Sequence, residues 1–192
     1  MNSLASASRW LIPAFWIAWL AIWIGASFNV KRTREREDWR TGFYNRAPVT
    51  LGAVMLAWPG WLPVALTRRL LWGPEGPALG TVLVAAGLAF SLWARWHLGR
   101  NWSGIVTVKQ DHTLITDGPY RFVRHPIYSG LLLALLGSAL ATGAPYGFVA
   151  IALILIGFVI KLRVEEERMR QTFPADYDSY SRHTARLIPG VY

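Results

Sequence analysis

The chain has 192 residues, of which 53% are hydrophobic and 16% are charged, and its formal net charge is +9. A soluble domain of this size surrounds one core with a charged exterior, whereas here the apolar residues form long runs separated by short basic stretches. Many of the 11 tryptophans lie near the ends of these runs, and indole rings favour the headgroup region of a bilayer. The composition excludes a soluble globular domain and indicates an integral membrane protein.

The positive charge is explained by the membrane rather than by nucleic acid. Lys and Arg collect in the cytoplasmic loops of membrane proteins, where they meet anionic lipid, so we expect the lipid bilayer and no nucleic acid as partner. The chain has no cysteine, which excludes disulfides and thiolate chemistry. Its four histidines are scattered without a familiar ligand spacing, so no metal site is expected.

Five apolar runs are candidates for membrane spans, because a bilayer core of about 30 Å needs roughly 20 apolar residues in a helix. They cover residues 10–30, 48–66, 78–96, 127–142 and 146–160. Pro59, Gly60 and Pro63 interrupt the second run and should kink it or leave it irregular near one face. The sequence predicts an all-α integral membrane protein with about five transmembrane helices.

The fourth and fifth runs are separated only by Gly143, Ala144 and Pro145, which predicts a tight antiparallel helical hairpin. Small residues recur about every four positions along the fourth run, and such spacing lets two membrane helices approach closely. These residues are Gly130, Ala134, Gly137, Ser138 and Ala141.

The basic linkers predict the orientation. With five spans, the basic residues within 31–46, 100–124 and 161–186 all lie on one side, which the positive-inside tendency makes cytoplasmic. The N-terminus is therefore expected outside and the C-terminus inside. We interpret residues 1–77 as two transmembrane helices with a basic cytoplasmic loop, and residues 78–192 as a catalytic region. The short length and plain N-terminus favour a prokaryotic plasma membrane.

The hairpin should bring two polar segments together at its cytoplasmic end. Residues 124–128 read Arg-His-Pro-Ile-Tyr, with Tyr128 one helical turn after His125, and residues 161–167 read Lys-Leu-Arg-Val-Glu-Glu-Glu. The carboxylates could hold a cation or a ribose diol, and the basic residues an anion. The alternatives are an interfacial anchor and a solvated helix face with weak ion pairs.

Beyond these residues, larger apolar side chains recur at helical spacing. They are Met169, Phe173, Tyr177 and Tyr180. Pro174 should start a new helical turn. We expect an amphipathic segment that lies on the bilayer or caps the site.

Taken in order, several motifs resemble the isoprenylcysteine carboxyl methyltransferase family of integral membrane methyltransferases. They lie at residues 98–103, 112–115, 118–120, 124–128, 165–166 and 186–189, with Phe173, Tyr177 and Tyr180 between the last two. The resemblance covers roughly the second half of the chain. It implies S-adenosylmethionine as methyl donor, S-adenosylhomocysteine as product, and a cytoplasmic cofactor pocket.

The resemblance also implies residue roles. The cofactor would be bound by His112, Thr113, Leu114, Ile115, Tyr120, His125, Pro126, Ile127, Tyr128 and Glu165. A basic residue one turn before Glu165 would orient the substrate; Lys161 stands there, where the family favours arginine, and Arg163 is nearby. The candidate catalytic residues are Lys161, Arg163, Glu165, Glu166 and His125.

We therefore predict a membrane methyltransferase that acts on the carboxylate of an isoprenylcysteine or another lipophilic acceptor, either a small molecule or a lipidated one. A carboxylate is already ionised near neutral pH and needs no base, whereas an amine or thiol acceptor would use His125 as base. The alternative acceptors are a phospholipid amine and a small thiol. The alternative of another class is a non-catalytic transporter or assembly factor, which would carry ionisable residues inside its spans; the five runs contain almost none.

Overall fold

The computed structural model describes residues 3–28, 39–70, 73, 75–99 and 114–190, and these residues are mainly helical. The elements are α1 (Ser3–Ser27), α2 (Trp39–Ala57), η1 (Pro59–Trp61), α3 (Val64–Thr67), α4 (Glu75–Leu98), η3 (Gly118–Arg121), α5 (Pro126–Thr142), α6 (Pro145–Thr172) and α7 (Pro174–His183). Helices α1, α4 and α6 are long and apolar enough to cross a membrane, and α5 is a shorter apolar helix. The predicted all-helical membrane fold is confirmed, while the count of five spans stays a prediction.

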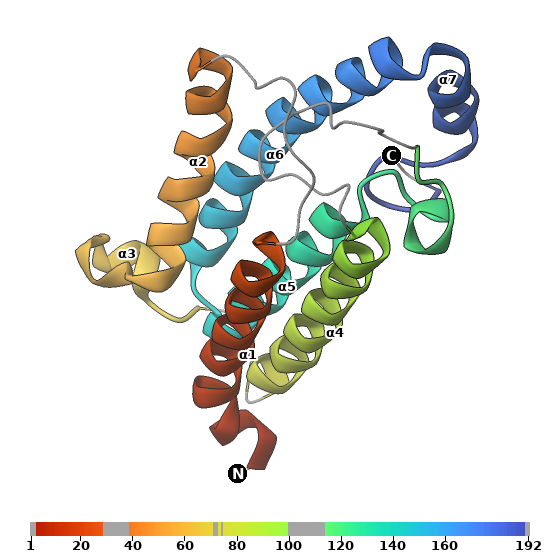
Figure 1. Cartoon of the computed structure of the whole chain (residues 1–192). Coiled ribbons are helices and arrows are strands. Elements are labelled where there is room, and N and C mark those ends of the chain that lie inside the picture. The colour runs from red at the N-terminus through yellow and green to blue at the C-terminus, as the bar shows by residue number, and fades with distance from the viewer. Residues whose placement is uncertain (1–2, 29–38, 71–72, 74, 100–113, 191–192) are drawn as a thin grey trace.

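The helices form two groups that meet along α5 and α6 (Figure 1). One group holds α1, α4 and α5, and the other pairs α2 with α6. The end of α1, the start of α2, the end of α4, the start of α5 and the end of α6 all point toward the same end of the molecule (Figure 1). The orientation of the chain in the bilayer, with the basic linkers on the cytoplasmic side, stays a prediction.

Glycines set the close packing of α4 on α5. A Cβ added at Gly87 would lie 2.5 Å from the carbonyl oxygen of Gly130, and a Cβ at Gly130 would lie 2.5 Å from the carbonyl oxygen of Gly87. Gly80 and Gly137 repeat this mutual approach two turns away. The small residues of the fourth run were expected to allow a close helix approach, and the helix that they approach is α4: Gly130 and Ala134 meet Gly87, and Gly137 and Ala141 meet Gly80.

The second predicted run is also displaced. Helix α2 begins at Trp39 and ends at Ala57, whereas the predicted run covers residues 48–66. The prediction starts too late because the first turns of α2 contain Arg40 and Arg46, which interrupt the apolar pattern. The expected irregularity is confirmed: η1 and α3 follow, and Pro59 occupies the first position of η1. Helix α2 approaches α6 closely, since a Cβ added at Gly157 of α6 would lie 2.5 Å from the carbonyl oxygen of Asn45 of α2.

The hairpin turn forms as predicted. Gly143 ends α5 in the left-handed region at φ 62° and donates its N–H to the carbonyl of Ala139 at 3.1 Å, a conformation that glycine adopts without strain. Pro145 then occupies the first turn of α6, where no amide donor is lost. Helix α6 continues past the expected end at residue 160 to Thr172. Its 28 residues span about 42 Å, which is longer than a bilayer core, so its polar turns extend beyond the apolar region.

Helix α1 is attached through its tryptophans. The indole N–H of Trp16 donates to Ser138 Oγ at 3.1 Å, and that of Trp19 donates to Ser91 Oγ at 2.7 Å. An unpaired N–H in an apolar environment is costly, so these two bonds fix the rotation of α1 against α4 and α5.

The glycine crossing gives a stability prediction. We expect Gly130→Ala to lower the free energy of unfolding by about 1–3 kcal/mol, because the added methyl meets backbone atoms of α4 that cannot yield locally. Denaturant titration of the detergent-solubilised protein measures the change. Gly25→Ala is the matched control, because a Cβ there has no neighbour within 4 Å; equal losses in the two variants would contradict a tight crossing.

Candidate active site

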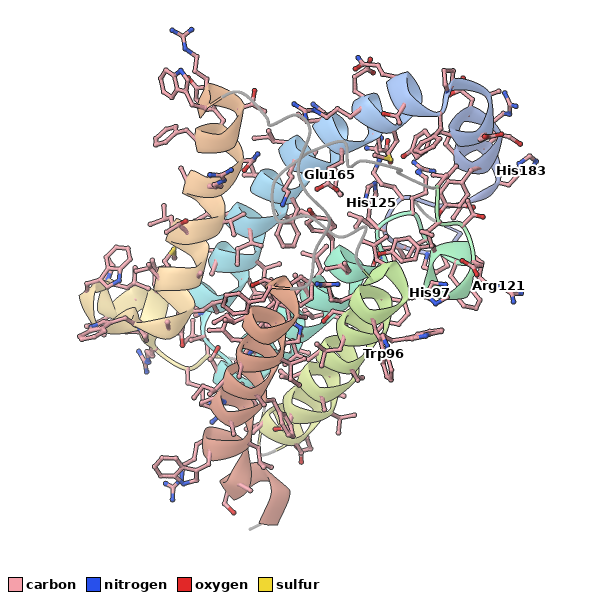
Figure 2. All side chains as sticks on the ribbon, viewed as in Figure 1. Trp96, His97, Arg121, His125, Glu165 and His183 are labelled. Atoms are coloured by element: carbon pink, nitrogen blue, oxygen red, sulfur yellow. The ribbon has the colours of Figure 1, made fainter. Side chains whose placement is uncertain are left out.

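The predicted polar segments meet where α5 begins beside the polar half of α6. His125 is the N-cap of α5, and its ring lies close to Glu165 of α6 (Figure 2). This juxtaposition follows from the hairpin, because the start of α5 and the end of α6 lie at the same end of an antiparallel pair.

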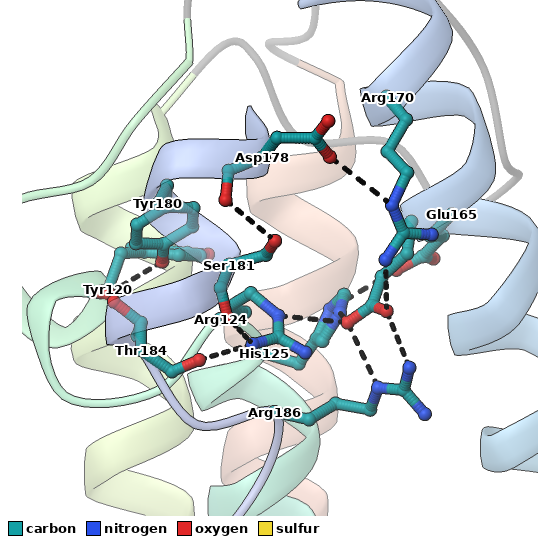
Figure 3. Close-up of polar contacts among 11 residues, drawn as sticks. Tyr120, Arg124, His125, Glu165, Arg170, Asp178, Tyr180, Ser181, Thr184 and Arg186 are labelled. Atoms are coloured by element: carbon teal, nitrogen blue, oxygen red, sulfur yellow. Dashed lines mark hydrogen bonds and ion pairs between the residues drawn. The ribbon is translucent and has the colours of Figure 1, made fainter. Parts of the chain in front are cut away.

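Glu166 is the most buried polar residue of this region, with 1% of its side chain exposed. Its Oε1 accepts hydrogen bonds from Nε of Arg124 and Nε of Arg186, each at 3.0 Å, and lies 3.2 Å from Nε2 of His125. Its Oε2 accepts from Nη2 of Arg186 at 2.6 Å (Figure 3). The carboxylate is thus surrounded by donors and is inaccessible to a ligand.

The ionisation of Glu166 reflects these partners. Burial alone would raise the pKa of Glu166, but hydrogen bonds from His125 and Arg186 and the charge of Arg124 outweigh burial and hold the pKa of this carboxyl well below its usual range. Glu166 is therefore an anion near neutral pH.

Residues 184–187, here called the C-terminal strap, run along the start of α5. The amides of Arg124 and His125 donate to the carbonyls of Ala185 and Arg186 at 2.8 and 3.1 Å. Ser129 Oγ donates to the carbonyl of Leu187 at 2.6 Å. Because Arg186 belongs to the strap and also binds Glu166, the strap closes the cluster from the C-terminal side.

Helix α7 caps the same region. Pro174 begins α7 after a break at Phe173, so Met169 lies on α6 whereas Tyr177 and Tyr180 lie on α7. Tyr180 donates its hydroxyl to the carbonyl of Tyr120 at 2.6 Å, and Arg124 Nη1 donates to the carbonyls of Ser181 and Thr184 (Figure 3). Of the two alternatives for the tail, these contacts favour capping.

Glu165 belongs to a second, more accessible group. Tyr128 donates its hydroxyl to Glu165 Oε1 at 2.8 Å, and Lys161 Nζ lies 3.9 Å from the same oxygen. The ammonium of Lys161 is 5.7 Å from the centre of the Tyr128 ring, and the rings of Tyr128 and Phe158 pack edge to face with their centres 4.8 Å apart. About a fifth of each of the Lys161 and Glu165 side chains is exposed, so this group can contact a ligand.

Other predicted residues fall elsewhere. Arg163 is exposed, two residues from both Lys161 and Glu165 on the helix and therefore on a different face. Pro126 and Ile127 are buried, and Ile127 packs with Ala94 and Tyr120, so these two residues support the site rather than line it.

The remaining predicted cofactor residues lie before α5. Ile115 packs against the cluster that contains Tyr120 and Ile127, and Leu114 lines an open cavity of about 460 Å³ beside α7. Burial, and then the charge of Glu165, raises the pKa of Tyr120, so its hydroxyl stays neutral. His112 and Thr113 lie outside the described residues. Within the described part of the chain, no group of His, Asp and Glu side chains could hold a metal ion.

Sequence reasoning missed the roles of the arginines. The sequence places Arg124 in the polar site as a residue that holds an anion, with an interfacial anchor as the alternative, and Arg186 only in a motif; in the structure both bind Glu166. The available signal was the presence of basic residues on both sides of the segment with consecutive acids, but nothing in the sequence pairs Arg186 with Glu166.

Two tyrosines of α7 give a paired prediction. Tyr180→Phe should lower the free energy of unfolding by about 1 kcal/mol, because it removes the donor to the carbonyl of Tyr120. Tyr177→Phe should be neutral or stabilising, because that buried hydroxyl has no hydrogen-bond partner among the residues that the structure describes. Denaturant titration of both variants measures the difference, and a greater loss for Tyr177→Phe would contradict the geometry.

Glu166 also predicts how stability depends on pH. Its pKa is lower in the folded state than its ordinary value of 4.5, so its ionised form contributes fully to stability above that value. This contribution is lost as the pH falls below 4.5 toward the folded-state pKa. Thermal unfolding of wild type and Glu166→Gln between pH 7 and about pH 3 should therefore give curves that converge on acidification. Curves that stay parallel would show that Glu166 gains nothing from ionisation.

The chain is similar to known membrane methyltransferases. Residues 76–176, slightly more than half of the chain, match the sequence profile of the phospholipid methyltransferase family. A probable protein-S-isoprenylcysteine O-methyltransferase of Oryza sativa subsp. indica is 32% identical over 116 residues, which cover 59% of this chain and 61% of the rice protein. The protein-S-isoprenylcysteine O-methyltransferase of Saccharomyces cerevisiae is 32% identical over 116 residues, 59% of this chain and 48% of the yeast protein.

The fold has a solved counterpart. The structure of the eukaryotic intramembrane Ras methyltransferase, isoprenylcysteine carboxyl methyltransferase, superposes with a TM-score of 0.56 at 23% identity, covering 74% of this chain and 52% of that one. The chain thus spans about half to three fifths of the length of these relatives. It belongs to the phospholipid methyltransferase family, and its fold resembles that of the isoprenylcysteine carboxyl methyltransferase structure.

Proposed function

We propose that this protein transfers a methyl group from S-adenosylmethionine to the carboxylate of a lipophilic acceptor. An isoprenylcysteine is the acceptor that we favour. The observation that carries the proposal is the accessible group of Lys161, Tyr128 and Glu165 at the polar end of an apolar bundle. The named activity of the relatives supports the same chemistry.

The residues of this group fit a cationic donor. When bound, S-adenosylmethionine supplies an electrophilic methyl group on a positively charged sulfur. A positive centre is stabilised by the face of an aromatic ring and by a carboxylate, which Tyr128 and Glu165 offer together. Glu165 Oε2 has His125 Nδ1 at 3.7 Å, beyond hydrogen-bond length, so this oxygen remains available to a ligand. We infer that Glu165, Tyr128 and His125 bind the donor.

Lys161 is the candidate for orienting the acceptor. In the transfer, an acceptor oxygen forms a bond to the methyl carbon while the carbon–sulfur bond breaks and its electron pair stays on sulfur, so no proton moves. The residues then act by alignment and exclusion of water. The ammonium of Lys161 can attract the acceptor carboxylate, and its position beside Glu165 brings acceptor and donor together. Arg163 is exposed on another face and is not assigned this role.

The apolar part of the acceptor would reach Lys161 from the bilayer. Phe158 contacts Tyr128, and the cluster of Leu135, Ile154 and Phe158 is covered by Val49 and Leu56 of α2 and by Trp16 of α1. We therefore infer that α2, rather than Trp93 and Trp96 of α4, lies beside the acceptor's path. Trp96 is 85% exposed, on the side of α4 that faces away from this cluster (Figure 2).

We further propose that residues 78–192 carry out the methyl transfer. In this proposal the N-terminus lies outside and the site lies on the cytoplasmic side of the membrane.

One observation favours a second acceptor chemistry. His125 Nδ1 lies next to Glu165, and an imidazole nitrogen in that position can take a proton from an amine or thiol acceptor. Phospholipid amines are the leading alternative, and a small thiol is the other. The stability of the product distinguishes a carboxylate acceptor from an amine or thiol acceptor, because a methyl ester is cleaved by mild base whereas methylamines and thioethers survive it.

The binding of S-adenosylmethionine and S-adenosylhomocysteine to detergent-purified protein tests the proposal. Glu165→Gln should weaken calorimetric binding of S-adenosylmethionine by at least about tenfold, or about 1.4 kcal/mol, because it removes the charge that faces the positively charged sulfur. Binding of S-adenosylhomocysteine, whose sulfur is neutral, should weaken less. Lys161→Ala should leave both affinities nearly unchanged but abolish transfer of radiolabelled methyl to an isoprenylcysteine acceptor.

Arg163→Ala is the matched control, a basic residue of the same helix on a different face; it should change neither measurement. Absence of saturable binding by folded wild-type protein, or equal effects of Lys161→Ala and Arg163→Ala on transfer, would contradict the proposal.

A further inference from the structure

The ring of His125 lies between two consecutive carboxylates of α6. Its Nε2 is 3.2 Å from Glu166 Oε1, and its Nδ1 is 3.7 Å from Glu165 Oε2. About 10% of the His125 side chain is exposed. The two ring nitrogens therefore have different environments, one facing a buried anion and the other an accessible one.

Glu166 determines which nitrogen carries the proton of the neutral ring. A carboxylate has only acceptors, so a hydrogen bond at 3.2 Å requires the proton on Nε2. Without that proton, the lone pair on Nε2 would face the negatively charged oxygen of Glu166, and the two atoms would repel each other without forming a hydrogen bond. Glu165 competes weakly for the proton, because its oxygen is 0.5 Å further from the ring (3.7 against 3.2 Å) and more exposed.

We propose that Glu166 is a positioning residue, which holds His125 in the tautomer with the proton on Nε2 and so presents Nδ1 as a hydrogen-bond acceptor beside Glu165. Nδ1 and Glu165 Oε2 then form a pair of acceptors at the accessible edge of the cluster. Such a pair receives an N–H or O–H donor of a bound ligand. For a neutral ring, the tautomer follows from the 3.2 Å contact of Nε2 with the Glu166 carboxylate, and only the identity of the ligand rests on the proposed function.

Arg124 and Arg186 make this arrangement possible. They supply the positive charge without which a carboxylate that is 1% exposed would be strongly disfavoured. Arg186 acts twice, because its side chain holds Glu166 while its carbonyl accepts the amide of His125. The backbone and the ring of His125 are thus held by the same strap residue.

The groups that face His125 come from every neighbouring element. They are Glu165 and Glu166 of α6, Arg124 before α5, Tyr128 of α5 with its ring centre at 6.0 Å, and Arg186 of the strap. Arg170 also lies 3.8 Å from Glu166 Oε2 but is 43% exposed and binds Asp178 at 3.7 Å. It touches Glu166 on the oxygen that does not face His125.

The tautomer can be measured directly by two-bond ¹⁵N–¹H correlation NMR on full-length protein labelled with ¹⁵N-histidine, in detergent without ligand, at a pH where His125 is neutral. The His125→Gln spectrum assigns the resonance. We expect the Nε2–H form to dominate in wild type. In Glu166→Gln the ratio of Nε2–H to Nδ1–H should fall about fivefold, since a neutral amide is a weaker acceptor than a carboxylate.

Arg170→Ala is the matched control: it removes a cation next to Glu166 and should leave the tautomer ratio unchanged. A dominant Nδ1–H form in wild type, or the same ratio in wild type and Glu166→Gln, would overturn the inference. If Glu166→Gln does not fold, the wild-type spectrum alone decides, and Arg186→Lys, which keeps the charge on Glu166, should preserve the Nε2–H form.

Calorimetry with S-adenosylhomocysteine separates this inference from the proposed function. An Nε2–H ring in a folded protein that does not bind the ligand would leave the positioning role intact and reject the donor. Binding by a protein whose ring is in the Nδ1–H form would support the donor and reject the positioning role.

Discussion

The site depends on keeping one carboxylate charged inside the protein. Glu166 is 1% exposed and ionised, and the cost of removing such a group from water is several kcal/mol unless cations and donors surround it. The hydrogen-bond donors come from the start of α5 and from the C-terminal strap, and α6 itself adds the guanidinium of Arg170 at 3.8 Å. Because the carboxylate needs all of them, it joins segments that apolar packing alone would leave unconnected at the polar end of the bundle.

The apolar bundle in turn makes the polar cluster possible. Glycine contacts bring the backbones of α4 and α5 together, and a second glycine contact joins α2 to α6. These crossings fix the height of His125 relative to Glu165 and Glu166, since α5 and α6 are joined by a turn of only two residues. Without backbone contact at Gly87 and Gly130, the start of α5 could slide or rotate, and distances near 3 Å around Glu166 could not be kept.

Much of this architecture could be predicted because its signals are local. Gly143 and Pro145 mark the turn, and an antiparallel hairpin then brings residues 124–128 to residues 161–167. Three features could not be predicted. The partner of the small residues in α5 depends on tertiary packing, the start of α2 is hidden by its arginines, and the pairing of Arg186 with Glu166 joins residues twenty positions apart across a helix break. The sequence also treats Glu165 and Glu166 alike, although only the rotation of α6 decides which of them is buried.

The rotation of α6 explains why Glu166 is buried as a structural anion while its neighbour Glu165 is accessible to a ligand. Neighbouring residues of an α-helix point about 100° apart, so one acid faces the arginines and the interior while the next faces Tyr128 and Lys161. The imidazole of His125 contacts both, which makes it the link between the permanent charge and the accessible one. An acceptor carboxylate that approaches Lys161 must share its ammonium with Glu165, 3.9 Å away. Binding of a positive donor next to Glu165 would release that ammonium, so the charges of the site favour the donor before the acceptor.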